Sequence, residues 1–289
     1  MDGIIIIDKP KGYTSREIVD IVGKNYKTRK VGHTGTLDPL ATGVLVICVG
    51  KATKIVELIT SYDKEYIATF KFGVLTDSLD SEGNIISDNK IILSEEDVKK
   101  ALKELTGTYM QEVPIYSAVR VNGKKLYEYA REGLEVELPK HEVKVSSLEL
   151  LNIFEEDGHT IINVKCHVSK GTYIRSLGND IAKKLNTNAI MTDLRRTKQG
   201  DFLLEEAVML DALNKDTKLI SIKDCLSDYK TVKADKNLEE EIRNGKILNN
   251  KYESESVLFE DEKGEILALY KVYEKDNKLI KPWKMFITR

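Results

Sequence analysis

The chain has 289 residues, of which 41% are hydrophobic and 32% are charged, and its formal net charge is −2. These numbers fit one large globular domain, or a large domain with a small one beside it, and the longest apolar runs (4–7 and 44–49) are too short to span a bilayer. No basic leader with an apolar stretch opens the chain, so we expect a cytoplasmic protein without membrane association.

The cysteines and histidines argue against two kinds of site. Cys48, Cys166 and Cys225 are odd in number and widely spaced, which favours free thiols in a reducing compartment over a disulfide framework. They form no CxxC pair, and the four histidines lack the spacing of zinc ligands. We therefore expect no metal.

The near-neutral total charge hides two basic regions. Residues 1–60 carry nine Lys or Arg against six Asp or Glu, and residues 160–200 carry eight against two. If these regions meet in the fold, they form a positive face that attracts a polyanion such as nucleic acid. Lysines that only keep the surface solvated would give the same count.

Hydrophobic periodicity, capping boxes and turn residues predict a mixture of strands and helices. In chain order we expect a strand at 3–8, a helix from the capping box at Thr14 to about Tyr26, a strand at 44–49, a helix at 51–59, a strand at 64–73, a polar loop at 77–89, a helix from a second capping box at Ser94 to about Leu105, a strand at 116–121, a helix at 124–132, strands near 142–153 and 159–168, a helix near 175–185 and a strand near 189–198. These elements show no regular βαβ alternation, which favours an α+β fold.

The pattern of predicted elements changes near residue 229. A helix is expected at 236–244 with Gly245 just beyond its end, and three short strands follow. We therefore predict a large domain at 1–228 and a small β-rich module at 229–289.

One carboxylate, Asp38, stands between Gly32 and Gly43 in a segment too irregular for a helix or a strand. Pro39 shifts Asp38 toward extended geometry and so fixes the direction of its side chain, while the glycines at 32, 35 and 43 allow positive φ and close approach of a ligand. The segment predicts a rigidly aimed catalytic acid. A carboxylate that only closes the turn through an Asx hydrogen bond fits the same residues.

A second charged motif runs from Gly171 to Arg175, where a predicted strand ends and the next helix begins. The Arg175 guanidinium can hold a carboxylate or a phosphate through two parallel hydrogen bonds, and beside Asp38 it would keep that acid ionised. An ordinary surface arginine is the alternative.

Aromatic residues accompany basic ones at two further places. Tyr66 follows Asp63-Lys-Glu on a predicted strand, where its ring serves either as core packing or as a platform for an unpaired base. Residues 123–131 mix lysines, tyrosines and an arginine, as an RNA-facing loop or a solvated amphipathic helix would.

In this order, the motifs resemble those of the TruB family of bacterial tRNA pseudouridine synthases. The Asp38 loop is similar to the family's catalytic motif and Gly171–Arg175 to its arginine motif. The other similar segments are 8–10, 63–66, 76–80, 116–118, 123–133 and 194–197. The resemblance covers about residues 1–210, and the segment from 229 is similar, less distinctively, to the family's PUA-type RNA-binding module.

The resemblance implies a pseudouridine synthase fold with a mixed, largely antiparallel sheet flanked by helices. It also implies the isomerisation of uridine to pseudouridine at position 55, in the TΨC loop of tRNA, without a cofactor. The C1′–N1 bond breaks, the uracil turns, and C5 is joined to C1′. Asp38 would act at the ribose, as a nucleophile at C1′ or as the base of a glycal route. Arg175 would pair with Asp38, and Tyr66 would stack on the uracil and assist loss of the C5 proton.

The resemblance further implies which residues contact RNA. His33 would hold the RNA once the target nucleotide is flipped out, Leu194 would form an apolar wall, and Tyr173 would support the pocket. The basic residues expected to contact RNA are Lys9, Lys124, Lys125, Arg131, Arg195 and Arg196. The expected partner is the TΨC stem-loop of tRNA, bound by a monomer that requires no protein partner.

Three other functions fit parts of the sequence. A tRNA-binding or tRNA-folding chaperone without essential catalysis would also use the basic regions, although it gains nothing from Asp38 beside Arg175. A guide-dependent pseudouridine synthase inside a ribonucleoprotein would share the motifs. A glycoside hydrolase would need a second carboxylate about 5–9 Å from Asp38, and no partner motif stands out.

Overall fold

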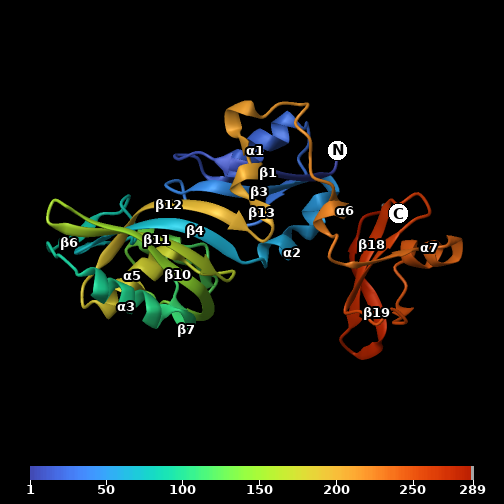
Figure 1. The fold of residues 1–289 in the computed structure, drawn as a ribbon. Helices are drawn as coiled ribbons and strands as arrows, with labels where there is room; N and C mark the ends of the chain where they lie inside the picture. Colours follow the sequence, from blue (N-terminus) through green and yellow to red (C-terminus); the bar gives the residue numbers. More distant parts are fainter. Residues whose placement is uncertain (288–289) are drawn as a thin grey trace.

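The computed structural model describes residues 1–287, and a ten-stranded sheet forms its centre (Figure 1). Eight strands follow the order β14-β1-β3-β12-β4-β11-β10-β7, while β2 pairs with β3 and β13 pairs with β12. The pairs β1–β14 and β3–β12 are parallel and the others are antiparallel. The expected α+β fold with a mixed, largely antiparallel sheet is confirmed. The strands of this sheet are β1 (Gly3–Lys9), β2 (Val31–His33), β3 (Thr42–Val49), β4 (Lys64–Phe72), β7 (Gly107–Glu112), β10 (Lys140–Glu156), β11 (His159–Val168), β12 (Ala189–Gln199), β13 (Phe202–Leu203) and β14 (Val208–Met209).

The apolar patterns of the strands explain their places in the sheet. β1 and β3 are buried along almost their whole length, as strands covered on both faces must be. β4 alternates fully buried and half-buried residues, which turns Tyr66, Phe70 and Phe72 toward the same face. The sheet therefore has its most covered part at β1 and β3.

Three helices cover one face of the sheet: α1 (Ser15–Asn25), α3 (Glu95–Leu105) and α5 (Ile174–Lys184). α1 begins at a capping box, because the Thr14 side chain accepts from the backbone N–H of Glu17 and the Glu17 carboxylate accepts from that of Thr14 at 2.7 Å. The apolar sides of the helices join one core with the strands, in which Ile18, Leu102 and Leu177 lie with residues of β4. This core fixes α5, and with it Arg175.

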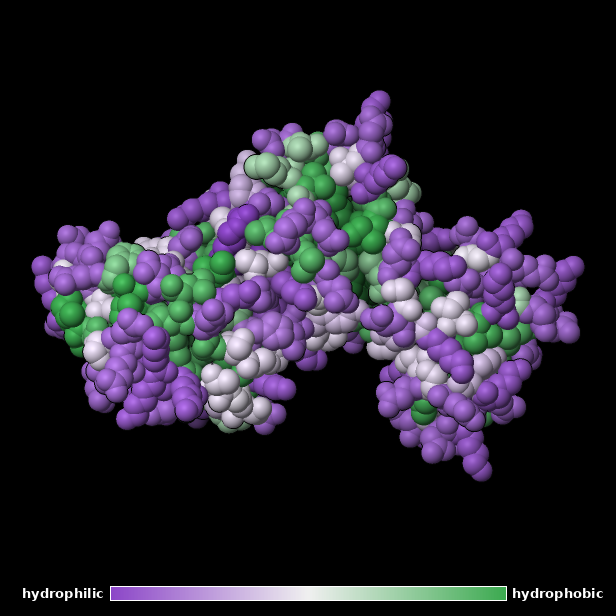
Figure 2. Space-filling model, viewed as in Figure 1, coloured by the Kyte–Doolittle hydropathy of each residue, from purple (hydrophilic) through white to green (hydrophobic). Residues whose placement is uncertain are grey.

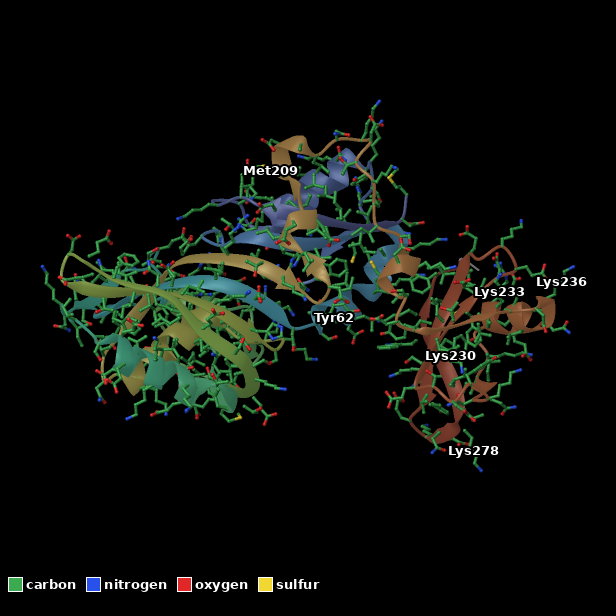
Figure 3. All side chains as sticks on the ribbon, in the orientation of Figure 1. Tyr62, Met209, Lys230, Lys233, Lys236 and Lys278 are labelled. Carbon is green, nitrogen blue, oxygen red and sulfur yellow. The ribbon has the colours of Figure 1, made fainter. Side chains whose placement is uncertain are left out.

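The other face of the large sheet carries short helices and the C-terminal module. η1 (Gly50–Ile55), α2 (Val56–Thr60) and α6 (Ile222–Cys225) pack here, so the helix expected at 51–59 is a 3-10 turn followed by a short α-helix. Residues of both sheets share one apolar cluster, among them Val46, Leu58 and Phe286. Tyr62 packs against this cluster on the side that faces the C-terminal module (Figure 3). The two sheets are thus joined by a common core.

The C-terminal module contains a five-stranded sheet with the order β15-β17-β18-β19-β16. Its elements are β15 (Lys230–Lys233), α7 (Lys236–Arg243), β16 (Leu248–Asn249), β17 (Ser256–Glu260), β18 (Ile266–Tyr273) and β19 (Asp276–Met285). Gly245 follows α7 with φ of +66°, as expected of a residue just beyond a helix end. Lys233, Lys236 and Lys278 extend into solvent from this module, whereas Lys230 donates through its Nζ to the carbonyl of Tyr252 at 2.6 Å (Figure 3). A β-rich module was predicted here, but with three strands, whereas the structure has five. The boundary between residues 228 and 229 stays a prediction.

Several small elements lie outside the two sheets. They are β5 (Val74–Thr76) paired with β6 (Ile85–Asp88), β8 (Arg120–Val121) paired with β9 (Lys124–Lys125), α4 (Leu126–Glu132), η2 (Leu204–Glu206) and η3 (Leu210–Ala212). The polar loop expected at 77–89 therefore includes a strand. The strand expected at 116–121 is wrong except at its last two residues, because Ser117 and Val119 accept hydrogen bonds from the start of α4 instead of from another strand.

The surface is hydrophilic over much of the face shown in Figure 2, with hydrophobic residues over the upper middle of the molecule and also at the end that carries β6. Ile85, Ile86 and Ile92 are exposed there. Within residues 1–287 we find no helix of the length and apolarity that crossing a bilayer would take.

Gly178 lets α5 lie close to β4, and its replacement should weaken that packing. A Cβ atom at Gly178 would stand 2.4 Å from the ring of Phe70, which is fully buried. Alanine gains about 1 kcal/mol in helix propensity, whereas overpacking a buried ring costs about 1–3 kcal/mol. We expect Gly178→Ala to lower the free energy of unfolding by up to about 2 kcal/mol in urea denaturation, since the buried ring cannot retreat. Asn179→Ala is the matched control and should be neutral or slightly stabilising; a Gly178→Ala variant as stable as that control would contradict the packing argument.

Candidate active site

A cleft of about 780 Å³ opens where the Asp38 loop, β4, β12 and the start of α5 meet. The predicted site residues that line it are Asp38, Tyr66, Tyr173, Arg175, Leu194 and Arg196. These side chains come from four parts of the chain that are far apart in sequence. The fold therefore brings half of the predicted residues into one hollow.

The Asp38 loop is held in place on both sides of the acid. The backbone N–H of Leu37 donates to Ser15 Oγ at 2.8 Å, and the carbonyl of Pro39 accepts from the N–H of Gly12 at 2.9 Å. Leu37 is itself buried. Because its neighbours are fixed, the half-exposed Asp38 carboxylate points in one direction.

The turn at Asp38 is closed by backbone atoms. The N–H of Ala41 donates to the carbonyl of Asp38 at 3.0 Å. In the described part of the chain, no backbone N–H donates to the Asp38 carboxylate. The geometry therefore favours an acid aimed into the cleft over an acid that only ties the turn.

Only one of the three glycines of this loop takes positive φ. Gly43 has φ of +97°, and a Cβ atom there would lie 2.2 Å from the carbonyl oxygen of Arg196 on the neighbouring strand β12. Gly32 and Gly35 do not adopt positive φ. Close approach of β12 explains Gly43, and the prediction of positive φ was wrong for the other two.

Arg175 is the counter-charge of Asp38. Its Nε lies 3.1 Å from Asp38 Oδ2, and its side chain is only 7% exposed. Its Nη1 donates to the carbonyl of Ser78 and its Nη2 to that of Tyr116, both at 3.0 Å. The planar guanidinium is thus held by two fixed carbonyls while one edge faces the acid.

A second carboxylate, Asp80, supports the same guanidinium. Its Oδ2 lies 3.6 Å from Arg175 Nη1, and its Oδ1 accepts from Ser78 Oγ at 2.6 Å and from the N–H of Glu82 at 3.1 Å. Asp80 is buried and does not line the cleft. It balances the buried charge of Arg175 from behind, so that Asp38 is left free to face the cleft.

The start of α5 is anchored to β7 by a buried relay of hydrogen bonds. The N–H of Tyr173, just before the helix, donates to Gln111 Oε1 at 2.8 Å. Gln111 Nε2 donates to the hydroxyl of Tyr109 at 3.0 Å, and that hydroxyl donates to Asp180 Oδ2 at 3.0 Å. Gln111 is fully buried. The backbone N–H of Tyr173 can only donate, so Gln111 must turn its oxygen to Tyr173 and its NH2 group to Tyr109. The Tyr109 hydroxyl then accepts from Gln111 and donates to Asp180.

Asp180 is the acceptor at the end of the relay. Burial raises the pKa of its carboxyl, and Lys183, whose Nζ lies 3.4 Å from Oδ1, opposes that shift. Burial also raises the pKa of Tyr109. A second anchor lies one residue further along β7, where the carbonyl of Glu112 accepts from Ser176 Oγ at 2.8 Å.

Tyr66 and Leu194 form apolar walls of the cleft. Tyr66 lies on β4 and Leu194 on the adjacent β12, where the register pairs Tyr66 with Arg196. The guanidinium of Arg196 lies 5.9 Å from the centre of the Tyr66 ring. Arg196 is itself almost fully buried, with Nε donating to the carbonyl of Val44 at 2.6 Å. It also lines the cleft.

Two buried lysines underlie the site. Lys9 has no exposed surface, and its Nζ donates to the carbonyls of Pro10 and Pro39. Burial lowers the pKa of Lys9 to about 8, although the Asp38 carboxylate opposes that shift. Lys64 lines the cleft, and burial together with Arg196 lowers its pKa to about 8. The expected RNA contact of Lys9 does not fit its placement, because it braces the Asp38 loop from inside.

Basic residues of the 120–131 segment lie beside the cleft, into which Tyr127 faces. Lys125 and Arg131 stack on the Tyr127 ring at 5.3 and 5.2 Å from its centre. Lys124 forms an ion pair with Glu132. Lys125 and Arg131 therefore lie at the rim of the cleft, because both contact the Tyr127 ring that lines it. The charge of Lys124 is balanced by Glu132.

His33 and Arg195 lie near the loop without lining the cleft. Burial and the charges of Arg196 and Arg16 lower the pKa of His33, which favours the neutral ring. Arg195 makes a fork of two hydrogen bonds to the carboxylate of Asp8, at 3.2 and 2.7 Å. Arg195 is therefore committed to a protein contact.

Three residues of the site had no predicted role: Asp80, Gln111 and Lys64. Asp80 and Lys64 fall within segments that resemble the family's motifs (76–80 and 63–66). The sequence around Asp80 does not show that its carboxylate reaches Arg175. Gln111 lies on an edge strand that sequence patterning missed. Within residues 1–287 no group of three or more His, Cys, Asp or Glu is placed to hold a metal ion.

Comparison with known proteins identifies relatives over the whole chain. A sequence model of the N-terminal domain of the TruB family pseudouridylate synthases matches residues 24–174. The tRNA pseudouridine synthase B of Shouchella clausii is 41% identical over 295 residues, which cover 98% of both chains. The tRNA pseudouridine synthase B of Caldicellulosiruptor saccharolyticus is 46% identical over 217 residues, 75% of this chain and 74% of the relative.

Solved structures share the fold at lower identity. A chain in the crystal structure of a Cbf5-Nop10-Gar1 complex matches with a TM-score of 0.72 at 24% identity, covering 99% of this chain and 85% of that one. A chain of an H/ACA RNP bound to a substrate RNA containing 2′-deoxyuridine matches with a TM-score of 0.70 at 23% identity, covering 99% and 86%. At these identities the likeness shows that the fold is shared.

The relay between Tyr173 and Asp180 predicts a pH-dependent defect in Gln111→Glu. The introduced carboxylate and Asp180 would compete for the single Tyr109 hydrogen, so one acid must be protonated. Burial and like charge raise the folded-state pKa of the pair above the unfolded value of about 4, so stability is retained at low pH and lost as pH rises through the raised value. We expect Gln111→Glu to lose about 3 kcal/mol of unfolding free energy near pH 8 and much less near pH 5, measured by urea denaturation followed by circular dichroism.

A second substitution tests the direction of the relay. Adding Asp180→Asn provides an amide that donates to the Tyr109 oxygen, which frees the hydroxyl hydrogen for the introduced carboxylate. The double variant should recover stability near neutral pH, and Asp180→Asn alone should change little. A Gln111→Glu variant whose stability follows wild type at every pH would show that the relay is not formed.

Proposed function

The chain belongs to the TruB family of pseudouridylate synthases, and on that premise we propose that its target is uridine 55 in the TΨC loop of tRNA. The enzyme is an isomerase that converts uridine in tRNA to pseudouridine. The observation that carries the assignment of the site is the Asp38–Arg175 pair at 3.1 Å, at the wall of a cleft that has an aromatic ring on one side and a leucine on another.

The reaction breaks the C1′–N1 bond, rotates the uracil and joins C5 to C1′. C5 then loses its proton and N1 carries one, so no other reactant is needed. Asp38 acts at the ribose, either as the nucleophile at C1′ or as the base that removes a ribose proton on a glycal route. Its fixed loop and half-exposed carboxylate support a role at the sugar, because such a group must be aimed before the substrate arrives.

Arg175 positions Asp38 and balances its charge. The guanidinium is held by the carbonyls of Ser78 and Tyr116 and by Asp80, so it cannot follow the acid if the acid moves. A binding protein without catalysis would gain nothing from such a buried arrangement, since RNA phosphates attract exposed cations. This contrast favours the isomerase over a tRNA chaperone.

The uracil is flipped out of the RNA and enters between Tyr66 and Leu194. Tyr66 stacks on the base and assists removal of the C5 proton, and Tyr173 supports the pocket beside Arg175. Unstacking costs a few kcal/mol, which stacking on an aromatic ring and contacts to the RNA backbone can offset. His33 holds the RNA next to the loop, and Lys125 and Arg131 contact it at the rim of the cleft.

We assign the isomerase site to residues 1–228 and additional RNA contacts to the PUA-type module at 229–289. The enzyme acts as a monomer on tRNA without a protein partner. The lysines on the outer side of the C-terminal module support the second assignment (Figure 3). Activity of the purified chain on bare tRNA transcript distinguishes it from a guide-dependent synthase.

Removing the Asp38 carboxylate should stop the reaction and leave tRNA binding intact. Asp38→Asn keeps the size of the side chain and its place in the loop but removes the charge that acts at the ribose. We expect the rate of pseudouridine formation to fall by about 10⁴-fold or more, the scale seen when a catalytic group is lost. The measurement is chemical mapping of pseudouridine on a tRNA transcript, with the dissociation constant for tRNA determined in parallel.

Asp193→Asn is the matched control, because Asp193 is exposed on β12 one residue before Leu194. It should modify position 55 at the wild-type rate. Normal turnover by Asp38→Asn would refute the assignment of the site, and a wild-type product at another position would refute the proposed target.

A further inference from the structure

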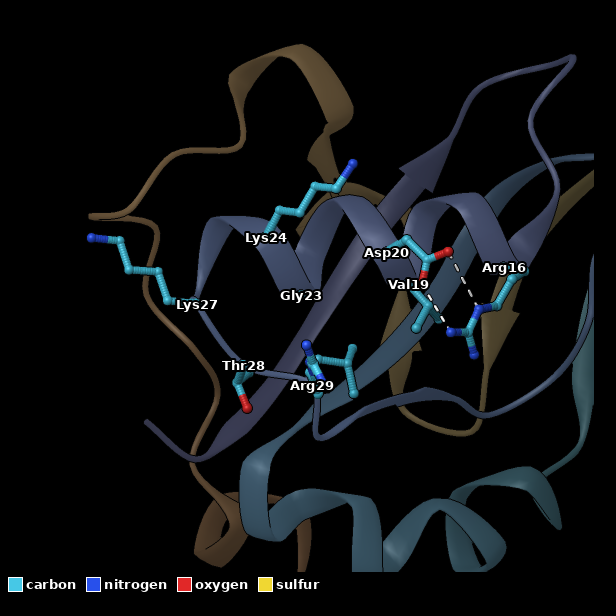
Figure 4. A pocket seen from close by; sticks show the side chains of 9 residues that line it. Arg16, Val19, Asp20, Gly23, Lys24, Lys27, Thr28 and Arg29 are labelled. Atoms are coloured by element: carbon cyan, nitrogen blue, oxygen red, sulfur yellow. Dashed lines mark hydrogen bonds and ion pairs between the residues drawn. The ribbon is translucent and has the colours of Figure 1, made fainter.

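A basic groove lies beside α1, outside the active-site cleft. Its volume is about 620 Å³, and the charged residues that line it are Arg16, Asp20, Lys24, Lys27 and Arg29 (Figure 4). Four cations and one acid thus surround one hollow. The groove belongs to the first of the two basic regions of the sequence.

Most of this positive charge has no counter-charge in the protein. Arg16 pairs with Asp20 at 3.0 Å, as the dashed lines in Figure 4 show. Lys24, Lys27 and Arg29 make no ion pair with any residue between 1 and 287, and all three are exposed. Like charges gathered at one hollow repel one another, so an anion bound among them lowers the free energy.

Helix electrostatics account for only part of this cluster. Lys24 lies in the last turn of α1, where a cation favours the helix dipole. Arg29 lies beyond the helix end, on the approach to β2, and gains nothing from that dipole. The helix dipole therefore does not account for the whole cluster.

A short segment of the chain leads from the groove to the Asp38 loop. β2 begins two residues after Arg29 and ends at His33, directly before the catalytic loop. Arg16, at the other end of the groove, is near enough to His33 to lower the pKa of its ring. An extended anion that leaves the cleft past His33 would run toward this groove.

The lining fits a sugar–phosphate backbone better than a base. None of the nine lining residues is aromatic, so the groove offers no surface for stacking. Its remaining wall is formed by Val19, Gly23, Thr28 and Val31, which are small or only partly exposed. Flexible lysines around a shallow hollow contact phosphates as point charges, independently of sequence.

We propose that the groove formed by Arg16, Lys24, Lys27 and Arg29 binds the phosphodiester backbone of the tRNA whose uridine occupies the cleft, at phosphates away from the target nucleotide. The inference rests on the proposed function and adds a second contact to it. The groove fixes the direction in which the RNA leaves the active site.

The test removes three charges from the full chain. In Lys24→Gln/Lys27→Gln/Arg29→Gln, binding of a tRNA transcript is measured by filter binding over a series of KCl concentrations. We expect the dissociation constant to rise about tenfold or more near 0.15 M salt, and the slope of log K against log salt to fall by about 2–3, since each phosphate contact contributes about 0.7–0.9. Circular dichroism checks that the variant is folded.

Two matched variants make the result specific. Lys99→Gln/Lys100→Gln/Lys103→Gln removes three exposed charges from α3 and should change neither quantity. Lys24→Arg/Lys27→Arg/Arg29→Lys keeps the charge and should bind as wild type does. If the three-glutamine groove variant has the affinity and salt slope of the α3 control, the groove does not bind RNA and the proposal is wrong. A wild-type chain that binds tRNA but makes no pseudouridine would refute the proposed function instead.

Discussion

The active site depends on how one buried guanidinium is satisfied. Arg175 is 7% exposed at its side chain, and a charge in that position is costly unless paired and hydrogen-bonded. Its partners are Asp38, Asp80 and the carbonyls of Ser78 and Tyr116, which come from three segments far apart in the sequence. Those segments can satisfy the charge only when they meet. The same requirement that stabilises the fold there therefore also places Asp38, the carboxylate that we propose to be catalytic.

The rest of the molecule supplies fixed points for that arrangement. β7 anchors the start of α5 through Gln111, and β12 approaches the end of the Asp38 loop so closely that Gly43 tolerates no side chain. The apolar core behind β4 holds α5 through the contact of Gly178 with Phe70. The RNA contacts that we propose lie elsewhere, at the cleft rim, in the groove beside α1 and on the C-terminal module. In this proposal, buried and fixed residues position the reacting groups, and exposed basic side chains position the RNA.

Sequence reasoning recovered the elements whose periodicity is strong. The helices after Thr14 and Ser94 and the long strands of the sheet were predicted to within a few residues, because capping boxes and alternating burial are local signals. The pairing of Arg175 with Asp38 was predicted from motifs, whereas Asp80 was missed because its contact depends on tertiary placement. The strand expected at 116–121 failed for a related reason: its backbone pairs with the start of α4. Lys9 and Arg196 are basic residues that sequence assigns to the surface and that the fold buries.

The most direct test of this account is the single-turnover rate of pseudouridine formation by Arg175→Lys, with tRNA affinity measured in parallel. A lysine keeps the positive charge but cannot reach Asp38, Asp80 and two carbonyls at once. The account predicts a rate at least about 100-fold below wild type with tRNA affinity retained, because a misplaced catalytic group costs this much. A rate close to wild type would contradict it, since charge alone would then be sufficient to position Asp38.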